Sequence, residues 1–130
     1  MPQKAVELIL MRQLASSLAM PILLFDNDGT LLFYNEPAEV LSGRRFDETG
    51  EMRFEEWSQQ VHVTDEDGTP LPFEVRPVGI ALRKRQASHR KFWGQGVDSV
   101  RRKYEATAFP LEGQGGRNLG AVMIPWEARS

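Results

Sequence analysis

The sequence contains no cysteine in its 130 residues. This absence excludes disulfide bridges, thiolate metal sites, cysteine nucleophiles and a photochemical flavin–cysteine adduct. The sequence also has no apolar run long enough to span a bilayer, and its N-terminus lacks the basic-then-apolar layout of a secretion signal. We therefore expect a cytoplasmic protein that has no membrane partner.

Neither sign of charge predominates, because 16 Lys and Arg residues nearly balance 18 Asp and Glu residues and the formal net charge is −2. Such a balance gives no general attraction to nucleic acid. Apolar residues make up 41% and charged residues 26% of the chain, which is typical of an ordinary soluble globule. The length suits one domain that buries a single core.

The segment from residue 21 to residue 43 organises the chain. Two short apolar runs, Ile22–Phe25 and Leu31–Tyr34, flank an Asp-Asn-Asp-Gly turn, and this pattern predicts a β-hairpin. Asn35 is a favourable N-cap for a helix over Glu36–Ser42, and a glycine follows where the helix should end.

The same segment admits an enzymatic interpretation. Asp26-Asn27-Asp28-Gly29-Thr30, preceded by Leu24-Phe25, fits the nucleophile motif of the haloacid-dehalogenase-like phosphatases. In that chemistry Asp26 would attack phosphorus, Asp28 would act as general acid and base, and Mg²⁺ would bridge carboxylate and phosphate. The alternative is a turn rich in Asp, Asn and Gly, a composition that turns favour for local reasons.

Residues 1–20 are predicted to form an amphipathic N-terminal helix that ends before Pro21. Its apolar residues recur every four positions and are widened by further neighbours: Val6, Leu10, Leu14 and Leu18, then Leu8, Ile9, Met11 and Ala15. Two arrangements remain open. The helix either packs wholly on its own domain or offers a second side to a partner helix in a parallel homodimer.

The rest of the chain predicts short helices followed by strands. Helical segments are expected at Phe54–Gln59 and at Phe73–Arg85, with Pro77 in the first turn of the second helix. Residues 61–63 are predicted to form a brief extended segment. Three longer strands are predicted, separated by loops at residues 95–99 and 112–118: Ser88–Gly94, Arg101–Leu111 and Leu119–Ile124. This order indicates an α+β domain with an antiparallel sheet and helices on one face.

Three segments, in the order in which they occur along the chain, resemble segments of a known protein family. They are Pro21–Asp26 followed by Asp28–Ala38, then Asp67–Pro72 leading through Pro77 to Arg83, and finally Tyr104–Leu111, a Gly-rich loop and Leu119–Met123. Together they resemble the PAS family of sensory domains, over roughly residues 14 to 126.

The resemblance implies a five-stranded antiparallel sheet, in the order 2-1-5-4-3, cupped around short helices over residues 21–126. Residues 127–130 would be a tail. Family members bind haem, flavin, small organic acids or nothing in the cup, and they pass a signal through flanking helices. No output segment follows residue 126, so we expect a stand-alone sensor or a fragment that acts on a separate output protein, such as a signalling kinase or regulator.

The predicted cup should be lined by mainly apolar side chains: Leu24, Leu32, Val40, Leu41, Trp57, Val78, Leu82, Tyr104, Ala106 and Val122. Small residues on a packed strand face leave room for a cavity, and we expect a small apolar or amphipathic ligand. The alternative is a filled core, which would make the domain a ligand-free interaction and dimerisation module.

Other chemistry is disfavoured by the same order of elements. Haem-binding members carry an axial histidine on the long helix, but Phe73–Arg85 contains none, and His62 and His89 lie elsewhere, so we expect no haem. The phosphatase needs a parallel α/β sheet, which this pattern does not predict. We therefore expect no enzymatic activity.

Basic residues are concentrated between positions 83 and 103, where Asp98 is the only acidic residue. They are Arg83, Lys84, Arg85, Arg90, Lys91, Arg101, Arg102 and Lys103. The cluster could be a solvated strand face, bind an anionic headgroup or meet an acidic partner, and we favour the first. We expect no nucleic-acid partner, because no aromatic residues or reading motif accompany the charges.

Overall fold

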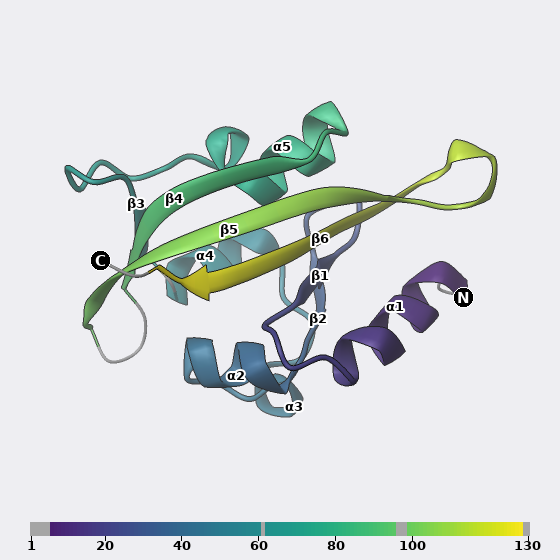
Figure 1. The fold of residues 1–130 in the computed structure, drawn as a ribbon, viewed down its shortest axis with the longest axis horizontal. Coiled ribbons are helices and arrows are strands. Elements are labelled where there is room, and N and C mark those ends of the chain that lie inside the picture. The colour runs from purple at the N-terminus through teal and green to yellow at the C-terminus, as the bar shows by residue number, and fades with distance from the viewer. Residues whose placement is uncertain (1–5, 61, 96–98, 129–130) are drawn as a thin grey trace.

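A six-stranded antiparallel sheet forms the centre of the protein, in the order β2-β1-β6-β5-β4-β3 (Figure 1). The structure is a computed structural model that describes residues 6–60, 62–95 and 99–128. The strands are β1 (Leu23–Phe25), β2 (Leu31–Tyr34), β3 (His62–Thr64), β4 (Ser88–Gln95), β5 (Arg101–Glu112) and β6 (Asn118–Glu127).

The α+β class and the antiparallel sheet are confirmed, but the sheet has one strand more than predicted. The extra strand is β3 at the sheet edge, where His62 pairs with Gln95 of β4. The other five strands keep the predicted relative order. Residue 61 of the predicted extended piece, residues 96–98 of the predicted loop and residues 129–130 of the tail lie outside the described ranges.

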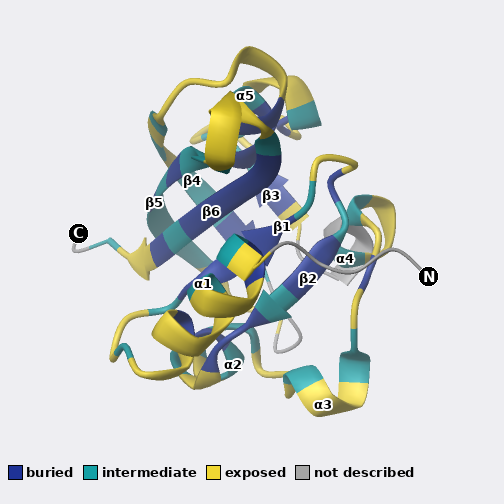
Figure 2. Cartoon of the chain, turned by 90° about the vertical axis from the view of Figure 1, so that its right-hand side faces the viewer, coloured by how far each residue is buried: buried dark blue, intermediate teal, exposed yellow. Residues whose placement is uncertain are grey.

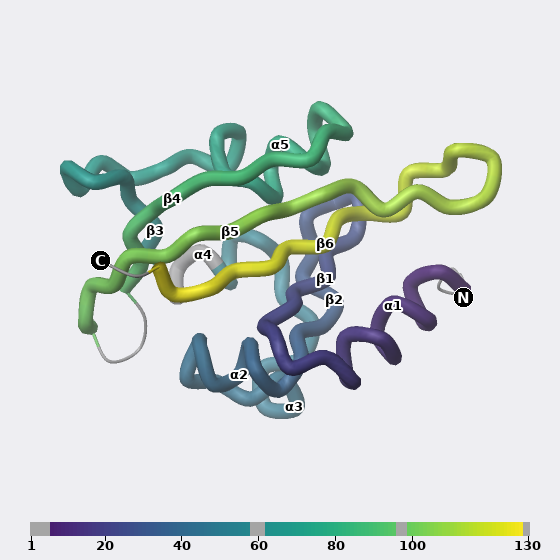
Figure 3. The backbone as a smooth tube through the Cα atoms, in the orientation of Figure 1, coloured from purple at the N-terminus to yellow at the C-terminus, as the bar shows by residue number. Residues whose placement is uncertain are grey.

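Helices cover both faces of the sheet. They are α1 (Val6–Ser16), α2 (Glu36–Ser42), α3 (Phe46–Thr49), α4 (Phe54–Gln60) and α5 (Pro77–Lys84), with short 3₁₀ turns η1 (Phe73–Val75) and η2 (Gln114–Gly116). Side chains of α2 to α5 pack on one face, which we call the inner face, while Leu8 and Ala15 of α1 pack on the opposite, outer face. Figure 3 traces this path, with the long β5–β6 hairpin reaching past the sheet above α1.

The central strands are consequently buried on both sides. Leu23 and Phe25 of β1 contribute to the inner core, whereas Leu24 between them packs under α1 in the outer core. Figure 2 shows β1 and most of β6 in the colour of buried residues, while the C-terminal end of β6 has the colour of exposed residues. Because successive side chains of a strand point to opposite faces, each central strand supplies two separate cores.

Asn35 joins three segments through its buried side chain, which is 2% exposed. Its Oδ1 accepts from the backbone N–H of Ile22 at 3.0 Å and from that of Ala38 at 3.2 Å, the second bond being the predicted N-cap of α2. Its Nδ2 donates to the carbonyls of Ala15 at 2.8 Å and Met20 at 2.9 Å. The amide therefore fixes the end of α1, the start of β1 and the start of α2 together.

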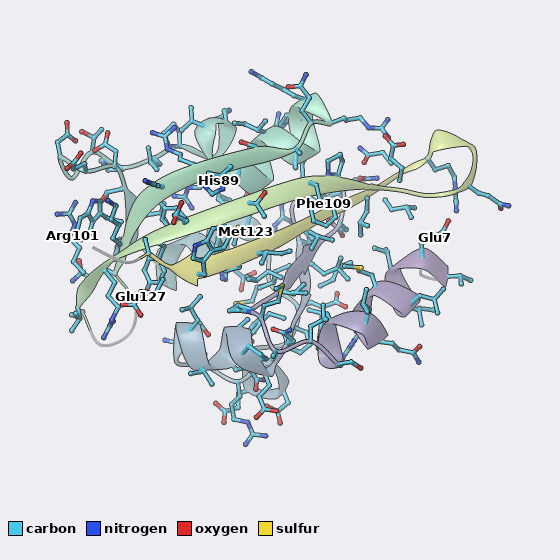
Figure 4. All side chains as sticks on the ribbon, in the orientation of Figure 1. Glu7, His89, Arg101, Phe109, Met123 and Glu127 are labelled. Atoms are coloured by element: carbon cyan, nitrogen blue, oxygen red, sulfur yellow. The ribbon has the colours of Figure 1, made fainter. Side chains whose placement is uncertain are left out.

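The N-terminal helix is shorter than predicted at its C-terminal end. It ends at Ser16 and not near Met20, because the Ala15 and Met20 carbonyls turn toward Asn35. Residues 1–5 of the predicted helix lie outside the described residues. Near its start, Glu7 accepts from the backbone N–H of Gln114 at 3.1 Å, and its side chain lies beneath the β5–β6 loop in Figure 4. Backbone N–H groups, its own and that of Gln114, lower the pKa of Glu7.

The predicted helix Phe73–Arg85 is interrupted. Arg76 adopts an extended conformation (φ −77°, ψ 150°), which separates the 3₁₀ turn η1 from α5. Pro77 causes the break, because a residue that precedes proline is driven out of the helical region. Pro77 instead begins α5, where its missing N–H leaves no bond unmade.

We predict that Asn35→Ala lowers the free energy of unfolding by about 3 kcal/mol. The change removes a helix cap, and it leaves buried backbone groups without partners. Asn35→Asp keeps the acceptor but loses both Nδ2 donors and places a carboxylate against two carbonyls, so it should also destabilise. Urea denaturation measures both changes.

Ser17→Ala is the control for these variants. The Ser17 hydroxyl makes one exposed hydrogen bond to the Gln13 carbonyl, so its loss should change stability by less than about 0.5 kcal/mol. An Asn35→Asp variant as stable as the unmodified protein would show that the two Nδ2 bonds contribute nothing.

Candidate functional site

A cavity of about 100 Å³ lies between the inner face of the sheet and the helices, and it is partly open to solvent. Every strand contributes to its wall, as do α2, α4 and the start of α5. The lining residues are Leu23, Tyr34, Ala38, Leu41, Ser42, Arg44, Met52, Trp57, Val63, Leu71, Arg76, Pro77, Val78, Phe92, Gly94, Gln95, Tyr104, Met123 and Pro125. The wall is mostly apolar.

Aromatic rings form one part of this wall. The rings of Phe92 and Tyr104 stack across β4 and β5 with their centroids 5.7 Å apart. Trp57 meets Phe25 edge to face at 5.9 Å. Gly94 lies beside this stack, and a Cβ there would lie 3.0 Å from the Tyr104 ring. The Phe92–Tyr104 stack therefore requires glycine at position 94, because a side chain there would crowd the Tyr104 ring.

The cavity wall has few polar side chains, and several of them already have partners. The Tyr34 hydroxyl lies 3.1 Å from both the Arg44 carbonyl and the Thr49 hydroxyl. The Gln95 amide donates to the Ser99 carbonyl at 2.8 Å. These bonds tie the rim of the cavity to neighbouring loops.

Arg76 differs from the other polar residues of the wall. Its Nε donates to the Leu71 carbonyl at 2.8 Å, and its guanidinium carbon lies 5.2 Å from the centre of the Phe54 ring. Its Nη1 is buried and has no hydrogen-bond partner. Burial lowers the pKa of the Arg76 guanidinium, because desolvation disfavours its charged form.

Of the residues predicted to line the cup, Leu41, Trp57, Val78 and Tyr104 lie in the cavity wall. Leu82 and Ala106 belong to the inner core but do not line the cavity. Whether any of these residues contacts a ligand stays a prediction.

Four other predicted lining residues lie elsewhere, which corrects the sequence analysis. Leu24, Leu32 and Val122 point to the outer face, where they pack under α1. Val40 is 80% exposed on α2. For Leu24 and Val122 the strand prediction was wrong by one position, and with a two-residue period a shift of one position moves a side chain to the opposite face. The adjacent residues Leu23 and Met123 line the cavity instead, and on β2, where the pairing with β1 shifts register, Tyr34 lines it in place of Leu32.

The sequence contains little signal for the residues that were missed. The β1 run is apolar at every position and buried throughout, so no alternation marks its inner face. Arg76 precedes a proline that begins a helix, and nothing in that pattern indicates a buried guanidinium. The side chain is half-buried through its contacts with the Phe54 ring of α4 and the Leu71 carbonyl.

Neither histidine lies in the cavity wall. His62 is exposed on β3, and His89 contacts Glu105 at 3.1 Å on the outer face of the sheet. Among the described residues, no group of three His, Cys, Asp or Glu side chains could hold a metal ion. The cavity is well below the roughly 300–1,000 Å³ of pockets for drug-sized ligands. The chain also has no cysteine for a flavin adduct.

The proposed phosphatase motif forms a hydrogen-bonded turn. The Asp26 Oδ1 accepts from the backbone N–H groups of Asp28 at 2.9 Å and Thr30 at 3.0 Å, and Gly29 has a φ of +83°. The flanking strands β1 and β2 are antiparallel. The predicted hairpin is confirmed. This segment does not form the parallel sheet that the phosphatase chemistry needs.

The same five-residue pattern occurs again between β3 and η1, as Asp65-Glu66-Asp67-Gly68-Thr69. There the Asp65 Oδ1 accepts from the N–H groups of Asp67 and Thr69, each at 3.1 Å. Two copies of Asp-x-Asp-Gly-Thr thus form the same turn at two places in the chain. The local turn interpretation explains both copies, whereas the phosphatase interpretation explains only one.

The basic cluster is partly paired. Arg85 lies 3.4 Å from Glu112, and Arg101 donates to the Asp65 carbonyl at 3.0 Å while it covers the Trp93 ring at 4.7 Å. Figure 4 shows Arg101 at the end of the sheet where β5 begins. These exposed contacts agree with the interpretation of a solvated strand face.

No protein-family model and no curated protein sequence matches the chain. Solved structures do resemble it. The PAS domain of BvgS from Bordetella pertussis matches with a TM-score of 0.67 and 15% identity, over 95% of this chain and 87% of that one. The Rhodobacter sphaeroides LOV protein matches with a TM-score of 0.74 and 12% identity, over 96% and 69%. A PAS domain from a two-component sensor histidine kinase matches with a TM-score of 0.62 and 13% identity, over 95% and 97%.

These likenesses establish the fold: the chain has the PAS fold. They confirm the architecture that the sequence resemblance implied. In the part of the chain that the structure describes, the search for a helix long and apolar enough to cross a membrane finds none.

We predict that the protein shows no Mg²⁺-dependent hydrolysis of an aryl phosphate ester beyond that of an Asp26→Asn variant. The Asp26 Oδ1 accepts from two backbone amides in a hairpin turn between antiparallel strands, and this is not the parallel-sheet setting that the phosphatase chemistry needs. Asp65→Asn, at the equivalent position of the second turn, is the matched control. Robust turnover that Asp26→Asn abolishes and Asp65→Asn retains would contradict this prediction.

Proposed function

We propose that this protein is a sensory signalling domain that binds a small ligand in its cavity and relays the signal through α1 to a partner. The observation that carries the proposal is the cavity, which is bordered by every strand of the sheet and by the helices of the inner face. A ligand there touches most elements of the fold at once. Its binding energy can therefore change how these elements pack.

The comparisons support the signalling part of the proposal. Domains with this fold include one from a two-component sensor histidine kinase. The output of such a sensor resides in another domain or protein, and a kinase or regulator is the class of partner that we expect here. The domain itself performs no catalysis in this proposal.

The structure supplies a connection between the cavity and α1. Leu23 lines the cavity, while its neighbours Ile22 and Leu24 pack in the outer core with α1. The backbone N–H of Ile22 also donates to Asn35, which holds the end of α1. A ligand that displaces β1 by a fraction of an ångström therefore acts on both faces of the sheet.

The exposed side of α1 favours a role in dimerisation, and it also supports the alternative of a ligand-free interaction module. Val6, Ile9, Leu10 and Leu14 are each 50–66% exposed and lie opposite the buried Leu8 and Ala15. Figure 2 shows α1 mainly in the colour of exposed residues. Large apolar side chains grouped on one helix face mark an interaction surface. A parallel pair of α1 helices would cover them.

We predict that native mass spectrometry of the freshly purified protein detects a small molecule that denaturation releases. Ala38→Leu should abolish this adduct, because Ala38 lines the cavity and the larger side chain occupies its space. Ala87→Leu adds the same atoms at an exposed position and should retain the adduct. An unmodified protein with no co-purified molecule and no thermal shift across a metabolite panel would favour the ligand-free module instead.

We predict that the protein is a homodimer whose dissociation constant rises at least about tenfold in the double variant Leu10→Glu/Leu14→Glu. Two carboxylates in an apolar helix interface lose their hydration without gaining partners. Analytical ultracentrifugation measures the change, and Gln86→Glu, at an exposed position away from α1, is the control for charge. If the unmodified protein remains a monomer at its highest soluble concentration, the dimer is wrong.

A further inference from the structure

The tip of the β5–β6 hairpin, residues 112–118, extends past the sheet and is contacted from two helices (Figure 1). On the α1 side, the Glu7 carboxylate accepts from the backbone N–H of Gln114 at 3.1 Å and lies 3.8 Å from the Arg117 guanidinium. Figure 4 shows the Glu7 side chain beneath the tip. This hydrogen bond joins residues 107 positions apart. A single side chain thus connects the first turn of α1 to the tip.

Gly113 makes room for this contact. Its backbone conformation (φ −95°, ψ −169°) is one that any residue adopts, so the turn itself does not require glycine. A Cβ at Gly113 would lie 2.7 Å from the Glu7 Oε2 and 3.0 Å from the Leu119 Cδ1. Gly113 precedes η2 and has no side chain to cap it. Glu7 of α1 therefore supplies the acceptor that a capping residue would supply, and glycine at position 113 lets its carboxylate approach.

Arg85 connects the same tip to α5. Its guanidinium Nη2 donates to the Gly116 carbonyl at 3.2 Å and to the Glu112 carboxylate at 3.4 Å. Arg85 directly follows the last residue of α5, while Pro77 and Val78 at the start of α5 line the cavity. Contacts therefore run from the cavity wall along α5 to the hairpin tip, and from the tip to α1.

The tip is held together by its own hydrogen bonds. The Gly113 N–H donates to the Arg117 carbonyl at 2.7 Å, and the Gly116 N–H donates to the Gly113 carbonyl at 3.2 Å. Arg85 and Glu7 thus hold one compact turn from two sides. A displacement of this turn changes both contacts together.

The two ends of α1 are held by different kinds of contact. The hydrogen bond from Asn35 to the Ala15 carbonyl is buried, whereas the bond between Glu7 and Gln114 is exposed. Water competes for an exposed hydrogen bond, and salt screens an exposed ion pair, so the contact at the start of α1 is the weaker one. The first turns of α1 are therefore the part that can leave the sheet while the end stays in place.

We propose that the hairpin tip is a clasp that couples α5 to α1. When the clasp is closed, Glu7 holds the first turns of α1 on the outer face. When it opens, these turns leave the sheet and uncover Leu8, which is 9% exposed in the closed state, so the apolar surface around Val6 and Ile9 becomes larger. The clasp goes beyond the proposed function, because it opens and closes without a ligand, and it gives the cavity a second connection to α1 besides β1.

Amide hydrogen exchange followed by NMR tests the clasp, with no ligand added and at one fixed protein concentration. In Glu7→Ala the amides of Gln114 and of residues 10–12 should exchange at least about threefold faster, because local opening becomes easier when an exposed charged contact is lost. The amides of residues 15–16, which Asn35 holds, should change less. Exchange in the central strand β1 is the internal reference for the fold and should not change.

Gly113→Ala is the decisive variant, because it leaves Glu7 in place. The added Cβ displaces the end of a flexible side chain, so this variant should open the clasp and keep the fold. It should accelerate exchange at the same amides, and the double variant with Glu7→Ala should be no faster than Glu7→Ala alone. Glu36→Ala, which removes an acidic residue from the first turn of α2, is the control and should leave α1 unchanged. Unchanged exchange in Gly113→Ala, or full additivity in the double variant, would overturn the clasp.

Arg85→Gln tests the connection to α5. It should accelerate exchange at Gln114 and at residues 10–12, although the substitution lies on the opposite side of the tip from Glu7. Lys84→Gln removes an exposed charge from the neighbouring position and is the matched control. An effect of Glu7→Ala without any effect of Arg85→Gln would overturn the coupling of α5 to α1.

These outcomes are independent of those that test the proposed function. Failure of the clasp leaves the ligand cavity in place, because no exchange measurement uses a ligand. The absence of a co-purified molecule and of a thermal shift overturns the ligand proposal and leaves the clasp in place.

Discussion

Asn35 holds three segments in register through four buried hydrogen bonds, and the position of α1 relative to the sheet depends on them. The amide uses its oxygen as an acceptor for β1 and α2 and its nitrogen as a donor to the end of α1. No other type of side chain of this size offers an acceptor oxygen together with two N–H donors. The buried amide therefore constrains how α1 covers the outer face.

Covering the outer face has a consequence for the cavity on the inner face. Because α1 buries Leu24 and Val122, the central strands contribute one set of side chains to the α1 contact and the alternate set to the cavity wall. The two cores share the backbone of β1 and β6. This arrangement suits a domain in which events at a ligand site alter the surface presented by a flanking helix.

Local hydrogen bonding made much of the fold predictable. The cap at Asn35, the bounds of α2 and the hairpin turn at Asp26 follow from residues close in sequence, and the structure confirms them. The relative order of five strands was implied by the family resemblance, and it is confirmed as well. The break at Arg76 was missed although Pro77 gives a local reason for it. The edge strand β3 is short, and its pairing with β4 joins residues 29 to 33 positions apart, which a local pattern does not reveal.

The sequence by itself determined the class of fold, the turns and caps, and the absence of cysteine chemistry, because these depend on residue type and on neighbours within a few positions. Only the tertiary structure decided which face of each central strand lines the cavity, because strands buried on both sides show no alternation of apolar and polar residues. It also decided that Arg76 is half-buried. The partial burial of that guanidinium arises from Phe54 of α4 and the Leu71 carbonyl, which come from two different segments, and no single segment encodes it.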